Sequence, residues 1–249
     1  MAVPIARNPS KARYQLLSKG ERNELRQLEA LDVKETRAGV GFRGDLVTAY
    51  RVCLWSRIAN RVLLPVKSFP AADPEELYNG VLAIDWTEHL TVDSTLAVDF
   101  STVQSAISHS QFGAQKVKDA ICDQFRHETG ERPSVDRQLP DLRVNVFLHR
   151  DKATVNIDLS GDSLHRRGYR LEGAGAPLKE NLAAAILMRA GWAEIAGQGG
   201  ALVDPMCGSG TLPIEAAMIA ADIAPGLLRA YWGFNGWKQH DVDCWTGLR

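Results

Sequence analysis

Residues 202–211 form the segment whose residue types and spacing are best suited to chemistry. A short apolar stretch leads to Asp204, a turn with Gly208 and Gly210 follows, and a helical pattern begins after the turn. The two glycines allow a tight turn that a ligand can approach without meeting a Cβ atom. The first N–H groups of the next helix suit an anionic group such as a carboxylate. The segment therefore predicts a cofactor-binding loop at the end of a sheet strand over 201–203.

The position of this loop predicts an incomplete domain. Only residues 212–249 follow it, and they are too few for the further strand–helix units of a doubly wound α/β sheet. The loop also lacks the Gly-Lys-Ser/Thr end of a P-loop and the third glycine of a dinucleotide fingerprint. We therefore expect the truncated start of an α/β domain with a different cofactor.

The composition argues against several classes of protein. The net charge of −1 gives no general basic surface, so any RNA binding must come from local patches. The longest apolar run, 182–188, is far too short to span a bilayer. We expect a cytoplasmic protein with no membrane segment.

The four cysteines form no C-x-x-C pair. We therefore expect neither a zinc site nor a disulfide framework, and we expect the four thiols to be reduced. Cys207 lies inside the loop, where a cysteine can act as a nucleophile. No partner base is identifiable for it, so we favour a small, packed loop residue.

Periodicity divides the chain into a polar, helix-prone segment at 1–38, an α+β module at 39–160 and a further unit at 161–249. The clearest element is a hairpin, because apolar residues alternate over 142–148 and again over 153–159. The other expected elements are strands over 39–44, 61–67 and 95–100 and helices over 46–58, 112–127, 177–190 and 210–222.

Seven further runs carry a resemblance to a known family. Together with the loop at 204–211, they resemble the bacterial 23S rRNA guanine-N2-methyltransferases. The runs are SQFGAQKVKDAI (110–121), RPSVDR (132–137), DLRVNV (141–146), DLSGD (158–162), HRRGYR (165–170), APLKE (176–180) and WGFNGWKQHD (232–241).

The resemblance implies both a fold class and a set of domains. Residues 39–160 would be an α+β THUMP domain, which binds RNA. Residues 161–249 would be the N-terminal part of a Rossmann-like methyltransferase domain that uses S-adenosylmethionine. Residues 1–38 stand where the family has its ferredoxin-like subdomain, although their helical pattern departs from the family's usual opening segment.

The resemblance also implies site residues. The cofactor site would consist of the loop and a neighbouring wall; its residues are Asp204, Pro205, Met206, Cys207, Gly208, Ser209, Gly210, Thr211, Pro177, Lys179 and Glu180. Contacts to 23S rRNA phosphates are expected from Arg166, Arg167 and Arg170, with an ordinary solvated linker as the alternative. Lys116 and Lys118 are weaker candidates, because nearby acidic residues offset them.

The chain departs from the family in its catalytic residues. The Asn/Asp-Pro-Pro-Tyr/Phe motif is absent up to Arg249, as is the acidic residue that would hold the cofactor ribose. We therefore expect no catalytic residue in this chain, no methyl transfer by the chain alone, and weak cofactor binding at most. The alternatives are an RNA-binding module without catalysis, a tRNA guanine-N2-methyltransferase and a DNA adenine-N6 enzyme. The hairpin and the run at 110–121 argue against DNA.

The C-terminal segment is unusually aromatic, with Trp232, Phe234, Trp237 and Trp245 within its last 18 residues. In a whole methyltransferase domain, further strands would cover much of that surface. We therefore expect an exposed apolar patch here and an unpaired strand edge beside 201–204. Residues 39–160 should then be the stable part, and residues 163–249 should be loosely packed or self-associating.

Overall fold

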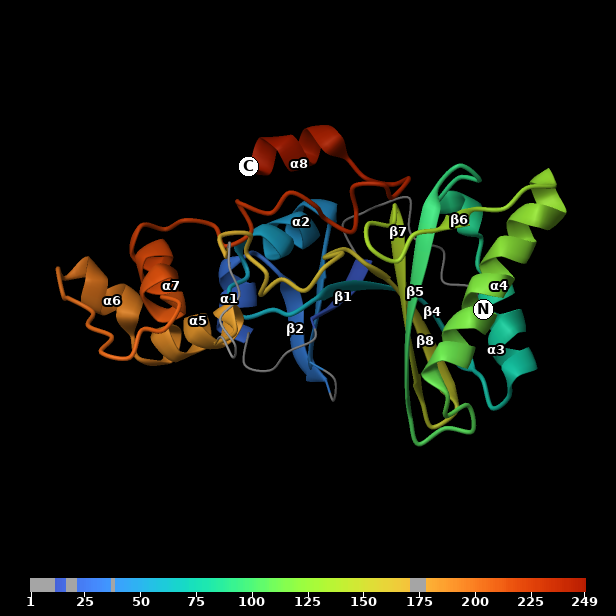
Figure 1. The fold of residues 1–249 in the computed structure, drawn as a ribbon, viewed down its shortest axis with the longest axis horizontal. Coiled ribbons are helices and arrows are strands. Elements are labelled where there is room, and N and C mark those ends of the chain that lie inside the picture. Colours follow the sequence, from blue (N-terminus) through green and yellow to red (C-terminus); the bar gives the residue numbers. More distant parts are fainter. Residues whose placement is uncertain (1–11, 17–21, 37–38, 171–177) are drawn as a thin grey trace.

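The computed structural model describes residues 12–16, 22–36, 39–170 and 178–249. They form one eight-stranded sheet in the order β2-β3-β1-β4-β8-β7-β5-β6. Helices pack on the sheet, and a group of short helices extends from one end of the molecule (Figure 1).

The first half of the sheet comes from six elements in the order strand, helix, strand, strand, helix, strand. β1 lies between β3 and the start of β4 and is antiparallel to both. Tyr14, Leu16 and Phe42 are buried together with side chains of the two helices. The bounds are β1 (Ala12–Leu16), α1 (Arg22–Gln27), β2 (Leu31–Thr36), β3 (Gly39–Gly44), α2 (Leu46–Trp55) and β4 (Val62–Pro70).

The second half of the sheet contains the predicted hairpin, in which Val144 pairs with Ile157. Two helices, α3 and α4, cover one face of these strands (Figure 1). Asp73 accepts the N–H groups at the start of α3, and Gly130 ends α4 at φ +80°. The bounds are α3 (Pro74–Leu82), the 3-10 helix η2 (Trp86–Glu88), β5 (Thr95–Val103), α4 (Ser110–Thr129), β6 (Ser134–Val135), β7 (Leu142–His149) and β8 (Lys152–Asp158).

Strand β4 belongs to both halves. Its first residues pair with β1, where Val62 lies opposite Leu16. The same strand pairs with β8 from Leu63 opposite Asp158 to Pro70 opposite Lys152. One continuous sheet therefore runs through both halves of the molecule.

The helical expectation for residues 1–38 is wrong for the segments that form β1 and β2. Within the described residues of this region, 12–16 and 22–36, helix is limited to α1. Leucines at helical spacing suggested one face of a helix, but Tyr14 and Leu16 point into the core with the two-residue period of a strand. Pairing with β3 supplies the backbone hydrogen bonds of β1, and tertiary pairing of this kind overrides a weak local pattern.

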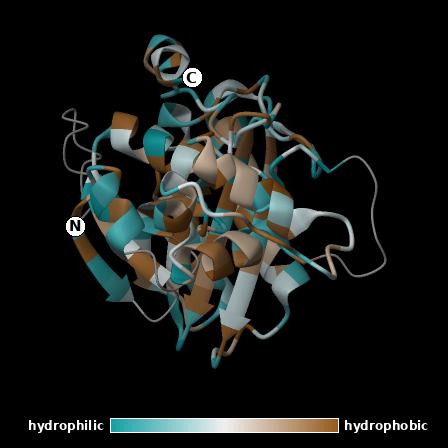
Figure 2. Ribbon diagram, turned by 90° about the vertical axis from the view of Figure 1, so that its left-hand side faces the viewer, coloured by the Kyte–Doolittle hydropathy of each residue, from teal (hydrophilic) through white to brown (hydrophobic). Residues whose placement is uncertain are grey.

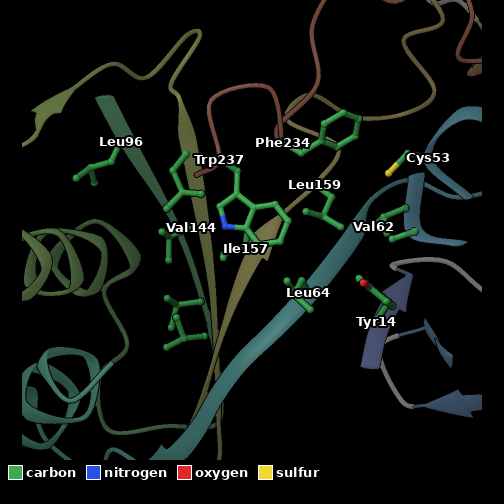
Figure 3. Close-up of a cluster of buried hydrophobic side chains, with 14 of the residues drawn as sticks. Tyr14, Cys53, Val62, Leu64, Leu96, Val144, Ile157, Leu159, Phe234 and Trp237 are labelled. Carbon is green, nitrogen blue, oxygen red and sulfur yellow. The ribbon is translucent and has the colours of Figure 1, made fainter. Parts of the chain in front are cut away.

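The aromatic C-terminal segment is buried, so the expected exposed patch of Trp232, Phe234, Trp237 and Trp245 is wrong. Phe234 packs against Tyr50 of α2, with ring centroids 4.6 Å apart. Figure 3 shows that Trp237 and Phe234 enter the same core as the strands of the hairpin. The last helix, α8 (Val242–Leu248), lies over α2. The aromatic segment therefore packs on the sheet half of the molecule, and its burial does not depend on further strands of a methyltransferase domain.

Helices α5 (Glu180–Arg189), α6 (Trp192–Gly197) and α7 (Thr211–Ala220) form a separate unit with a small core of its own. The strand expected over 201–203 is not formed, and Val203 is 85% exposed. A strand needs a partner, and the sheet lies away from this unit (Figure 1). Figure 2 faces this end of the molecule and shows hydrophobic ribbon segments among its helices.

Candidate cofactor-binding site

The loop at 204–211 is an exposed turn at the start of α7. The Asp204 carboxylate accepts the N–H of Met206 at 3.1 Å, and the Cys207 carbonyl accepts the N–H of Gly210 at 2.8 Å. Gly208 and Gly210 have φ values of +52° and +74°, which side chains other than glycine rarely adopt. No atom lies within 4 Å of the position that a Cβ on Gly208 would take. The turn is therefore closed by its own bonds and open toward solvent.

Arg170 connects this loop to the segment that precedes α5. Its guanidinium donates to the Thr211 hydroxyl at 2.9 Å and to the Ser209 hydroxyl at 3.3 Å. It also donates to the Glu180 carboxylate at 3.0 Å and to the Leu178 carbonyl at 3.2 Å. Arg170, predicted as an RNA contact, thus joins the loop to the expected wall of the site.

The wall residues differ in their access to a ligand. Glu180 is buried and bonded to Arg170, so it orients the guanidinium. Lys179 is exposed at the start of α5, and Pro177 lies outside the described residues. Pro205 and Met206 are exposed, and Met206 is 90% exposed. Free N–H groups at the start of α7, next to a guanidinium, fit the carboxylate end of an amino-acid-like cofactor.

Glu215 lies on α7 one turn beyond the loop and is fully buried. Its carboxylate accepts from the Tyr169 hydroxyl at 3.1 Å and from Arg167 Nε at 3.5 Å. Burial raises the pKa of Glu215, while the charge of Arg167 opposes this shift. The sequence analysis did not single out Glu215, because the sequence pattern alone does not show whether one acidic side chain in an apolar helix is buried or exposed to solvent.

Arg167 is 2% exposed, so its prediction as an RNA contact is wrong for this structure. Besides Glu215, its guanidinium donates to the Leu164 carbonyl at 2.8 Å and to the Arg57 carbonyl. A guanidinium without surface area cannot contact an RNA phosphate, and its surroundings compensate its charge. The run HRRGYR therefore contains a buried structural arginine as well as exposed residues.

The buried polar network continues into the first half of the sheet. Arg57, just after α2, donates to the Ile223 carbonyl at 2.9 Å. The Arg57 N–H donates to the Glu24 carboxylate at 2.6 Å, which also accepts from the Ser56 hydroxyl at 2.7 Å. Burial raises the pKa of Glu24. These bonds tie α1 and the end of α2 to the segment that directly follows α7.

Three family models match the chain. The ferredoxin-like domain of RlmL matches residues 22–63, the THUMP domain matches residues 71–158, and the RMKL-like methyltransferase domain matches residues 167–245. A relative from Syntrophotalea carbinolica named ribosomal RNA large subunit methyltransferase K/L is 61% identical over 91% of this chain. A relative of the same name from Methylococcus capsulatus is 62% identical over 90% of it.

By sequence, the chain is similar to these named methyltransferases over about nine tenths of its own length. It spans 32% of the length of the first relative and 30% of the second. The predicted fold class is confirmed: a THUMP domain is followed by the start of a methyltransferase domain. The ferredoxin-like match extends past residue 38, where the sequence pattern suggested a boundary.

Two solved structures share the fold of this chain. One, from Listeria monocytogenes and described as a predicted N6-adenine-specific DNA methylase, has a TM-score of 0.78 at 30% identity and covers 96% of this chain and 62% of its own. Another, SMU.472, was solved with SAH and has a TM-score of 0.78 at 32% identity; the match covers 96% of this chain and 63% of its own.

The other predicted RNA contacts lie on different segments, the one after β8 and helix α4. Arg166 is exposed but pairs with Asp162 at 2.9 Å. On α4, Lys118 pairs with Asp119 at 2.5 Å and Lys116 lies 5.9 Å from the centre of the Phe112 ring. The structure therefore does not gather the predicted cations into one surface.

Cys207 is exposed, so the expectation of a packed loop residue is wrong. Its thiol has a weak contact of 3.9 Å with the Gly208 carbonyl. Over the described part of the chain, no three His, Cys, Asp or Glu residues are placed to hold a metal ion. In the same part, no helix has the length and apolar character needed to cross a membrane.

Proposed function

We propose that the chain forms the RNA-binding part, and the start of the cofactor domain, of a 23S rRNA (guanine-N2)-methyltransferase that uses S-adenosylmethionine. The exposed loop at 204–211, held by Arg170 at the start of α7, carries the proposal. The matches to the THUMP and methyltransferase models support it. The division into 39–160 and 161–249 belongs to the proposal, as does a cytoplasmic location.

The chain's own residues would bind and orient the cofactor. S-adenosylmethionine supplies an electrophilic methyl group when it is bound. The N–H groups at the start of α7 and the guanidinium of Arg170 would hold the carboxylate end. Asp204 and the glycines shape the turn, and Glu180 fixes Arg170 in place. The residues at 204–211, Lys179 and Glu180 therefore remain the proposed cofactor site, with Arg170 added.

Activation of the nucleophile would need residues that these 249 positions do not include. The amino group of guanine is a poor nucleophile, because its lone pair is delocalised into the ring. An Asn/Asp-Pro-Pro-Tyr/Phe motif is absent from the sequence. We therefore assign binding and orientation to this chain, and no catalytic residue.

The preference for rRNA over DNA follows from the relatives. The relatives named as rRNA methyltransferases are 61% and 62% identical to the chain, whereas the neighbour described as a DNA methylase is 30% identical. A THUMP match spans the hairpin at β7 and β8. RNA is the substrate class that both observations favour.

Filter binding tests the choice of nucleic acid. The chain should retain an unmodified 23S rRNA transcript more tightly than a DNA duplex of the same sequence. Equal affinity for the two would contradict the rRNA assignment. Methyl transfer to that transcript by residues 1–249 alone would contradict the account of the missing motif.

Calorimetry with S-adenosylmethionine tests the cofactor site. We expect weak binding that Asp204→Ala reduces further, because the turn loses its closing bond. Asp243→Ala, at an exposed position in α8, is the matched control and should leave binding unchanged. Micromolar binding that survives Asp204→Ala would remove the loop from the proposed site.

A further inference from the structure

A shallow hollow lies on the face of β1, β2 and β3 that is turned away from α1 and α2. Tyr14, Leu16 and Phe42 of these strands point to the helix side and are buried. The side chains that alternate with them point to the opposite face. They line a cavity of about 290 Å³ whose rim carries Arg13, Gln15, Lys34, Thr36 and Arg43, with one acidic residue, Asp32.

Gly41 forms the floor of this hollow. It lies on the middle strand, opposite Gln15 of β1 and Lys34 of β2. A Cβ at Gly41 would meet its nearest atom, in Thr36, at an ordinary 3.5 Å. Neither crowding nor a left-handed backbone therefore requires glycine here. A glycine inside a strand weakens the sheet, and it often marks a place where a ligand approaches the backbone closely.

The charge of the rim is positive. Arg13 and Lys34 are exposed, and among the described residues no acidic side chain pairs with either of them. Arg43 pairs with Asp32 at 3.3 Å, so these two charges compensate each other. Two cations without an acidic partner in the described part of the chain thus face one hollow, in a chain whose net charge is −1.

Polar groups complete the lining. The Gln15 amide donates to the Thr36 hydroxyl at a long 3.5 Å, and the Thr36 hydroxyl donates to the Gly39 carbonyl at 3.1 Å. The Gln15 amide therefore keeps hydrogen-bonding capacity for a ligand. In an RNA segment, the cations can contact phosphate groups, and the amide can contact the edge of an unpaired base.

We propose that this hollow is an RNA-binding site, which holds the backbone of an unpaired RNA segment and admits one of its nucleotides at Gly41. The proposal rests on the rRNA substrate class proposed above and names a surface for it. An acidic polypeptide would also be attracted by Arg13 and Lys34. It would make no specific use of the glycine floor, and competition experiments separate the two.

The charge test uses Arg13→Gln/Lys34→Gln in the 249-residue chain, with an unmodified 23S rRNA transcript as the probe. We expect affinity to fall about tenfold or more at 0.1 M salt. The slope of log affinity against log salt should fall by about 1.4, because each lost contact to single-stranded phosphate removes about 0.7. Arg189→Gln/Lys238→Gln, at two exposed positions outside the hollow, removes the same charge and is the matched control, which should match the wild type.

The floor test uses Gly41→Val, which adds volume without changing charge. The variant should fold at least as stably as the wild type, because valine suits a strand, and its thermal unfolding is the folding control. RNA affinity should fall at least fivefold while the salt slope stays unchanged. A loss of affinity without a change in folding is a result that a purely structural role for Gly41 does not give.

Three outcomes would overturn the inference. If the wild type binds the transcript and all the hollow variants bind it equally well, the hollow is not the site and the rRNA proposal stands. If polyglutamate competes as well as RNA does, the hollow is a site for acidic polypeptides. If the wild type binds no RNA, both the hollow and the proposed function fail.

Discussion

The sheet half of the molecule and the α5–α7 unit differ in how they bury apolar surface. The sheet half has one large core that includes the aromatic C-terminal segment, and Trp232 there is 1% exposed. The α5–α7 unit has a core of Leu187, Trp192 and Ala216, while Leu182 and Ile186 are about half exposed. The site that resembles a cofactor loop thus lies in the less tightly packed region.

This difference indicates that the sheet half stabilises the fold and that the α5–α7 unit is the region suited to ligand binding. Local opening is least costly where few apolar contacts must be broken, and ligand-binding loops are commonly drawn from such regions. The expectation that 163–249 would be loosely packed therefore describes α5–α7, whereas residues near Trp232 and Trp245 belong with the sheet. The boundary between the loosely packed and the tightly packed residues therefore lies inside the methyltransferase match and not at its first residue.

The largest effect is expected from Trp232→Ala. Its ring lies between Phe234, with centroids 5.7 Å apart, and the Arg229 guanidinium, 4.7 Å from its centre. Removing it should lower the free energy of unfolding by about 3–5 kcal/mol. Trp192→Ala, in the small core, should change global stability by about 1 kcal/mol or less, because α5–α7 opens separately. Urea denaturation followed by circular dichroism measures both, and equal losses would abolish the distinction.

Arg167→Ala tests the connection between the two regions. It leaves Glu215 buried without its cation, which should cost about 3 kcal/mol. Arg167→Met/Glu215→Met removes both charges and should recover most of that loss. Hydrogen exchange in α7 is the second measurement, and protection there should fall with Arg167→Ala. A loss in the double variant as large as in the single one would contradict the coupling.

Acid should destabilise the sheet half. Burial lowers the pKa of His89 to about 4 from an ordinary 6.5, and its Nδ1 accepts the Trp237 indole N–H at 3.2 Å. As the pH falls, His89 is protonated at a higher pH in the unfolded chain than in the folded chain. The stability that neutral His89 contributes to the fold is therefore present above pH 6.5 and is lost as the pH falls toward 4. About 2 kcal/mol should be lost between pH 7 and pH 5. Thermal unfolding of wild type and His89→Gln checks this, since the variant should show a flatter profile over that range.

The smallest effects come from a pair of glycines with similar backbone angles. Gly130 ends α4 at φ +80°, and Gly210 precedes α7 at φ +74°. Gly130→Ala should lower global stability by about 1 kcal/mol, because alanine is strained there. Gly210→Ala should leave the unfolding midpoint almost unchanged and weaken cofactor binding measured by calorimetry. A midpoint shift as large as that of Gly130→Ala would show that the loop is part of the main cooperative unit.

The sequence predicted elements whose pattern is local. The hairpin at β7 and β8 and the helix α4 were predicted because two- and 3.6-residue periods are visible along a single segment. The strand at 201–203 was wrong, since a strand exists only with a neighbour. The roles of Arg167 and Arg170 depend on Glu215 and Glu180, each of which follows them by at least ten positions, and no spacing rule connects such pairs.

Strand β4 has a consequence for motion. Because β4 is hydrogen-bonded to β1 on one side and to β8 on the other, no flexible linker separates the ferredoxin-like match from the THUMP match. A hinge at β4 would have to break backbone hydrogen bonds between neighbouring strands and would expose two unpaired sheet edges. We therefore expect the two halves to move together in solution. A long nucleic acid that touches both halves would have to adapt its own shape to a fixed surface.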